Sequence, residues 1–79
     1  MINSALLDDI RLIGYDAKIS QDGHITVQGT SDYGADFFIL EDEEAYWVFE
    51  NWGGTNYECI DGFGDIDKAL NFAKRLELS

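Results

Sequence analysis

Residues 36–52 read DFFILEDEEAYWVFENW, and this stretch decides the fold. Two apolar runs, Phe37–Leu40 and Ala45–Phe49, stand on either side of four consecutive acidic residues. Both runs have the length and the aromatic and β-branched content that are typical of strands. The stretch therefore predicts a β-hairpin with an acidic turn, and it holds six of the sixteen Asp and Glu residues of the chain.

Because successive side chains of a strand point to opposite sides, this hairpin has two apolar faces. If Glu41 lies opposite Glu44 in the hairpin, the side chains of the two strands fall into two groups, one on each face. One face is expected to carry Phe38, Leu40, Ala45, Trp47 and Phe49. The other is expected to carry Phe37, Ile39, Tyr46 and Val48. We predict that the first set, which is bulkier, forms the core because it buries the larger apolar area, and that the second set is less covered by helices.

The residues before the hairpin begin with a predicted helix. Apolar side chains recur at helical spacing over residues 2–13. Asn3 is a suitable N-cap, and Ile2 and Leu7 are spaced as a hydrophobic staple. Gly14 suits the left-handed position that follows many helices. We therefore expect this helix to end just before Gly14.

Two alternating segments follow the predicted helix, at residues 15–20 and 24–28. A two-residue turn between them would place apolar against polar side chains across the two strands. A three-residue loop that ends at Gly23, in a left-handed bulge conformation, instead pairs Ile19 with Ile25. We therefore predict the bulged loop.

The residues after the hairpin predict a turn, a short strand and a second helix. Asn51–Thr55 is expected to be a turn and Tyr57–Ile60 an edge strand. Asp65 is a suitable N-cap for a helix over Ile66–Leu78. The predicted fold class is α+β, with an antiparallel sheet of four to five strands and N- and C-terminal helices packed on one face. Residues 1–79 are expected to form a single domain.

The composition excludes several classes of function. The net charge of −11 repels nucleic acids and anionic membrane surfaces, both of which prefer basic proteins. We expect no signal peptide, because the sequence lacks the apolar segment that such a peptide requires. The single cysteine cannot form an intramolecular disulfide. The prediction is a cytoplasmic protein.

The sequence offers little for catalysis or metal binding. His24 is the only histidine and is expected to be a solvated turn residue. Cys59 is the only cysteine and is expected to be a small buried hydrophobic residue. No nucleophile, base and orienting group can be assembled from these residues with any specificity. We therefore expect no enzyme, no cofactor and no metal.

The acidic residues are the remaining candidates for function. Carboxylates on alternate residues of a strand lie about 6.6 Å apart on one face and can imitate a row of phosphates. A solvated acidic face without a function is the competing interpretation. Aromatic residues beside the acids would supply contact anchors. The predicted partner-binding residues are Asp32, Asp36, Glu41, Asp42, Glu43, Glu44, Tyr46, Glu50 and Trp52.

The chain resembles the small, acidic, phage-encoded anti-defence proteins, especially anti-CRISPR proteins that act as DNA mimics. The resemblance lies in size, charge, the absence of proline and the order of a helix, a hairpin and an acidic sheet. It implies an inhibitor that occupies the nucleic-acid site of a host defence enzyme, such as the PAM-reading or guide–target channel of a CRISPR-Cas effector, whose walls are basic. It implies no catalytic residue. A phage-encoded inhibitor of this kind would act in the host cytoplasm.

Two other functions remain open at this point. An immunity protein or antitoxin that neutralises a basic toxin nuclease would use the same electrostatics against a different partner. A small housekeeping homodimer would use the residual apolar face of the central hairpin instead. The expected partner is a basic protein in the first two cases and a second copy of the chain in the third.

Overall fold

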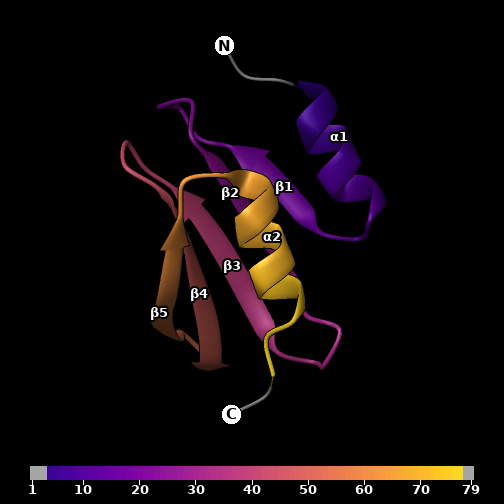
Figure 1. Ribbon diagram of the computed structural model, residues 1–79, viewed down its shortest axis with the longest axis vertical. Coiled ribbons are helices and arrows are strands. Elements are labelled where there is room, and N and C mark those ends of the chain that lie inside the picture. Colours follow the sequence, from indigo (N-terminus) through magenta and orange to yellow (C-terminus); the bar gives the residue numbers. More distant parts are fainter. Residues whose placement is uncertain (1–3, 78–79) are drawn as a thin grey trace.

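The computed structural model describes residues 4–77 as a five-stranded antiparallel sheet with a helix at each end of the chain (Figure 1). The strands lie in the sheet in the order in which they occur in the sequence. The elements are α1 (Ser4–Leu12), β1 (Asp16–Ile19), β2 (Ile25–Thr30), β3 (Asp36–Glu41), β4 (Tyr46–Gly53), β5 (Asn56–Phe63) and α2 (Ile66–Lys74). The predicted α+β class is confirmed.

Both helices pack on the same face of the sheet, as predicted (Figure 1). Helix α1 lies against β1, and α2 lies over β3, β4 and β5. Small side chains on α2, at Ala69 and Ala73, are fully buried and let this helix lie close to the strands. The core side chains are Leu7, Ile10, Ala17, Ile25, Val27, Ala35, Phe37, Ile39, Val48, Ile66, Ala69, Ala73 and Leu76.

The prediction of which hairpin face forms the core is wrong. Phe37, Ile39 and Val48 are at most 1 % exposed and face the helices. The bulkier set, which includes Phe38 and Trp47, lies on the face that no helix covers. The reason lies in the neighbouring strand, because Val27 pairs with Ile39 and so places both side chains on one face. Strand β2 has only one apolar face, and that face must be the core.

The turns differ in how well the sequence predicted them. The bulged loop before β2 is confirmed, with Ile19 paired to Ile25 and Gly23 at a φ of 83°. In the central hairpin Glu41 pairs with Tyr46 rather than with Glu44, so the register is shifted by two residues while the side chains keep their predicted grouping. The predicted turn at 51–55 is too long, because β4 continues to Gly53.

The predicted helix ends are partly confirmed. Helix α1 ends at Leu12, and Gly14 follows with a φ of 102° and donates its N–H to Arg11 O at 3.0 Å. Asp65 caps α2, since its carboxylate accepts the N–H of Asp67 at 2.9 Å. Helix α2 ends at Lys74, so the prediction of a helix that continues to Leu78 is wrong. The predicted N-cap Asn3 and the staple residue Ile2 lie outside the described residues.

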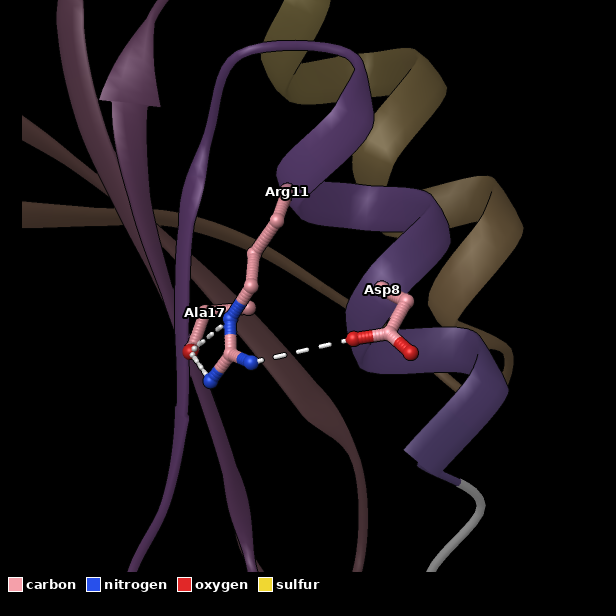
Figure 2. A network of polar contacts seen from close by, with 3 residues as sticks. All are labelled: Asp8, Arg11 and Ala17. Carbon is pink, nitrogen blue, oxygen red and sulfur yellow. Dashed lines mark hydrogen bonds and ion pairs between the residues drawn. The ribbon is translucent and has the colours of Figure 1, made fainter.

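Arg11 protects the β1 edge of the sheet, as Figure 2 shows. Its Nε and Nη2 donate to the carbonyl oxygen of Ala17 at 3.1 and 2.7 Å. Its Nη1 lies 3.9 Å from the carboxylate of Asp8, one turn earlier in α1. A guanidinium on an edge carbonyl removes an acceptor that another strand would otherwise use. The opposite edge, β5, is exposed over residues 56–61.

Candidate functional site: an acidic turn beside an uncovered aromatic face

Three chain connections meet at one end of the sheet, at the top of Figure 1. They are the β1–β2 loop, the β3–β4 turn and the link from β5 to α2. The N–H of Ile25 donates to Glu41 Oε1 at 2.8 Å and so ties the first connection to the second. The acidic residues at these connections are Asp22, Glu41, Asp42, Glu43, Glu44, Asp65 and Asp67. We call this region the acidic end.

Asp42 shapes the acidic turn. Its Oδ1 accepts the N–H groups of Glu44 and Ala45 at 2.7 and 2.9 Å, and its Oδ2 accepts the indole N–H of Trp47 at 2.8 Å. An Asp at the first position of a β-turn commonly makes such bonds. The two backbone bonds and then the indole bond hold the pKa of the Asp42 carboxyl below its ordinary value. Asp42 is therefore a structural residue of the turn, although it is exposed.

Glu41 and Tyr46 form a second structural pair. They lie opposite each other at the ends of β3 and β4, on the face that carries the helices, and both are half-buried. Burial, followed by a hydrogen bond to the Glu41 carboxylate and its negative charge, raises the pKa of Tyr46 above the ordinary tyrosine value. With the bond from Ile25, Glu41 serves two donors within the protein.

Glu43 and Glu44 are the acids of the turn whose side chains are open to a partner. Both are exposed, and no ion pair involves either side chain within residues 4–77. Of the predicted row of four acids, two therefore support the turn and two project from it. No residue of the β3–β4 turn has a positive φ, which agrees with the absence of glycine from this turn.

The other predicted site residues lie elsewhere. Asp36 is exposed at the start of β3, about 17 Å along this six-residue strand from the acidic end. Asp32 is exposed in the loop before β3. Glu50 is buried on the face that carries the helices, with only 6 % of its surface exposed. Trp52 is 53 % exposed near the end of β4. The structure therefore does not gather the nine predicted residues into one surface.

The uncovered face of the sheet is the feature that the sequence interpretation missed. We call its apolar residues Phe38, Leu40, Trp47, Phe49 and Tyr57 the aromatic face. Phe38 pairs with Phe49 across β3 and β4, and their rings stack with centroids 4.7 Å apart and planes 9° apart. Tyr57 meets Phe38 edge-on, also at 4.7 Å. Leu40 and Tyr57 are 39 % and 42 % exposed, and the other three are half-buried.

Trp47 connects the aromatic face to the acidic turn. Its indole N–H binds Asp42, and its ring lies on Gly62 of β5, where a Cβ would stand only 2.5 Å from the ring carbons. Glycine at this position is therefore required for the indole to lie flat on the sheet. The alternation of β2, with Thr26 and Gln28 opposite its apolar side, is the signal that would have identified the uncovered face from the sequence.

A hollow of about 290 Å³ lies beside the aromatic face. Its polar lining residues are Asp16, Gln28, Thr30, Asp36 and Asn51, and Tyr57 supplies an aromatic wall. Thr30 donates its hydroxyl to Asp36 Oδ1 at 2.9 Å. Asp16 has only a weak ion pair, with Lys18 at 3.9 Å and both side chains largely exposed.

The remaining candidates for chemistry are few. Cys59 is exposed on the uncovered face, where it pairs with Phe49, so the prediction of a buried thiol is wrong. His24 is half-buried in the loop before β2, where its backbone N–H binds Ser20 Oγ. Within residues 4–77, no group of His, Cys, Asp and Glu side chains is arranged to hold a metal ion. No helix in that part of the chain is long and apolar enough to cross a membrane.

The fold and this surface define a small acidic α+β protein with one helix-covered and one open sheet face. One relative is 32% identical over 77 residues, which cover 96% of this chain and 80% of the relative. That relative is the "Uncharacterized 9.8 kDa protein in Gp55-nrdG intergenic region" of Enterobacteria phage T4, and the chain belongs to its family. No family profile and no solved structure matches the chain.

Proposed function

We propose that this chain is an acidic DNA-mimic inhibitor that binds the nucleic-acid site of a host defence enzyme, such as a CRISPR-Cas effector. It acts by occupying that site and not as an enzyme. A family member in a phage supports a role against a bacterial host, with the host cytoplasm as the place of action.

The observation that carries this proposal is the lack of internal compensation for the negative charge. The net charge is −11, and the two ion pairs found within residues 4–77 are both 3.9 Å long and exposed. Such pairs contribute little and leave most of the acids without a cation. A field of this strength attracts a basic protein surface and speeds its association.

The acidic end is the region expected to lead the encounter. It holds seven acids within or directly beside three connections that share one end of the sheet, and the nearest Lys or Arg residues along the chain are Lys18 and Lys68. Glu43 and Glu44 project from it, while Asp42 keeps the turn rigid. Rigid presentation of charge lowers the entropy cost of binding.

The test begins with capture of binding proteins from an enterobacterial lysate on the immobilised chain. Each captured protein is then purified and loaded with fluorescent DNA, and displacement of the DNA by the chain is followed by anisotropy. We expect stoichiometric displacement that weakens as salt rises, because exposed charges are screened beyond about 8 Å at physiological ionic strength. Captured partners that keep their DNA at any concentration of the chain would contradict the proposal.

Two double variants of equal net charge sharpen this test. Glu43→Gln with Glu44→Gln removes two charges from the acidic turn, and Asp9→Asn with Glu77→Gln removes two exposed charges from other parts of the chain. We expect the first variant to associate about three- to ten-fold more slowly and the second to resemble the wild type. Equal slowing of both would show that total charge matters and the acidic end does not. A captured toxin nuclease in place of a defence enzyme would favour the antitoxin alternative.

A further inference from the structure

We infer that the aromatic face receives arginine side chains from the protein that this chain inhibits. The inference rests on the proposed function, because it specifies the surface and chemistry of the same partner. Its starting point is that the five residues of this face, Phe38, Leu40, Trp47, Phe49 and Tyr57, lie on the side of the sheet opposite both helices. A soluble protein rarely leaves several large apolar side chains together on one face without a contact to make.

The rings of this face are fixed before any partner arrives. Phe38 is stacked on Phe49 and is met edge-on by Tyr57, with both centroid distances at 4.7 Å. Trp47 is held by its bond to Asp42 and by its fit over Gly62. Because these side chains have little freedom left to lose, a cation that stacks on them meets a small entropy cost. Arginine is the protein cation that most often stacks on aromatic rings.

Carboxylates and amides stand where the guanidinium edge would need acceptors. Asp36 lies two residues before Phe38 on the same side of β3, and Asp16 belongs to the cross-strand row that runs through Gln28 to Phe38. Both carboxylates line the hollow of about 290 Å³ that has Tyr57 as a wall. A planar guanidinium can stack on a ring while its N–H groups bind a carboxylate, whereas a lysine ammonium offers no planar group to stack.

The negative charge of the chain favours an arginine-rich protein surface over a second copy of the chain or a nucleic acid. A second copy of the chain also has a net charge of −11, so it would be repelled by a face that carries Asp16 and Asp36. Nucleic acid, which also stacks on aromatic sheet faces, is repelled by the same field. An arginine-rich protein surface satisfies both the rings and the carboxylates. Such surfaces line nucleic-acid sites, so the inferred contact agrees with the proposed inhibitor.

The experiment uses two short peptides of equal charge, one of alternating Gly and Arg and one of alternating Gly and Lys. Each is titrated into the ¹⁵N-labelled chain at physiological salt, and amide and indole shifts are followed by NMR. We expect the arginine peptide to bind about three- to ten-fold more tightly. We also expect its shifts to centre on Phe38, Tyr57 and the indole N–H of Trp47. Equal affinities, or shifts confined to residues 43 and 44, would overturn the inference.

Variants separate this face from the acidic end. Tyr57→Ala and Asp36→Asn are each expected to weaken arginine-peptide binding about three-fold or more, while Asp9→Asn with Glu77→Gln leaves it unchanged. If Tyr57→Ala fails to fold, alkylation of the exposed Cys59 with a bulky maleimide blocks the same face in the wild-type chain. Retained peptide binding after that alkylation would overturn the inference. So would sedimentation that shows a dimer for the wild type and a monomer for the alkylated chain.

The same variants keep the two hypotheses apart. If the wild type displaces DNA from a captured partner and the Tyr57→Ala and alkylated chains do so equally well, the arginine contact is wrong and the proposed function stands. If no partner loses its DNA but the arginine peptide still binds the aromatic face selectively, the proposed function fails and the affinity of this face for arginine is supported.

Discussion

Both faces of the central hairpin are apolar, but they differ in the size, type and exposure of their side chains. The helix-covered face is built mainly from aliphatic side chains of medium size, such as Val27, Ile39 and Val48, all fully buried. The open face carries the larger residues, including Trp47 and Phe49, and leaves them half-exposed. Phe37 is the largest fully buried side chain of the core, while the rings of Phe38, Trp47 and Phe49 lie on the open face. The covered face supplies the core, and in the proposed function the open face supplies the contact with a partner.

The largest expected effect tests this division directly with two adjacent residues. Ile39 is fully buried and Leu40 is 39 % exposed on the opposite face. Ile39→Ala should lower the free energy of unfolding by about 2–5 kcal/mol, because it leaves a cavity between the sheet and the helices. Leu40→Ala should lower it by about 1 kcal/mol or less. Urea denaturation of the pair measures both, and equal losses would contradict the assignment of the faces.

The next prediction concerns a hydrogen-bonded residue that attaches the segment after α2 to the sheet. Ser31 is buried; its hydroxyl donates to the carbonyl oxygen of Leu76 at 2.6 Å and accepts the N–H of Ala35 at 2.9 Å. The same oxygen also accepts the N–H of Tyr33 at 3.2 Å. Ser31→Ala leaves these three backbone groups without this partner and should cost about 1–3 kcal/mol of unfolding free energy. Thr30→Val, which removes an exposed hydroxyl that binds Asp36, should cost less in the same urea titration. A reversed order would show that the hydrogen bond between Ser31 and Leu76 is not important for stability.

A pH-dependent prediction concerns the turn that joins the two faces. The pKa of Asp42 is lowered on folding, so its charged form stabilises the native state above its ordinary value of 3.8, and this contribution is lost as the pH falls through the lower folded value. Asp42→Asn keeps one acceptor oxygen, but the NH₂ group that replaces the second oxygen cannot accept the indole N–H of Trp47. The wild type should therefore be more stable than Asp42→Asn at pH 6, and the difference should shrink below pH 3.8. Glu43→Gln, whose exposed side chain projects from the same turn, is the control for the loss of one negative charge.

The smallest expected effect lies on the open face. Cys59 is exposed, and its replacement by serine changes neither size nor charge appreciably. Cys59→Ser should alter the unfolding free energy by less than about 0.5 kcal/mol and leave partner binding intact. Thermal melting and the peptide titration measure the two quantities. A large loss of stability would show that the open face contributes to the fold more than its exposure indicates.

Local patterns determined most of the secondary structure. The alternation on both sides of Gly23 predicted the bulged loop and the pairing of Ile19 with Ile25, because a one-residue slip would place apolar against polar side chains. Asp65 predicted the start of α2, since a carboxylate at an N-cap satisfies a free backbone N–H. The acidic turn and the two groups of alternating side chains in the central hairpin were also predictable from residues 36–52 alone.

The sequence by itself therefore determined the elements, their order, the side-chain grouping and the negative charge. Only the tertiary structure decided which face of β3 and β4 is buried, because both faces are apolar and the choice depends on pairing with β2, whose paired residues lie six to fourteen positions earlier in the sequence. It also decided that Glu41 and Asp42 support the turn while Glu43 and Glu44 project from it. Neighbouring acids look alike in a sequence, and their roles separate only when backbone donors and the Trp47 indole are brought within hydrogen-bonding distance.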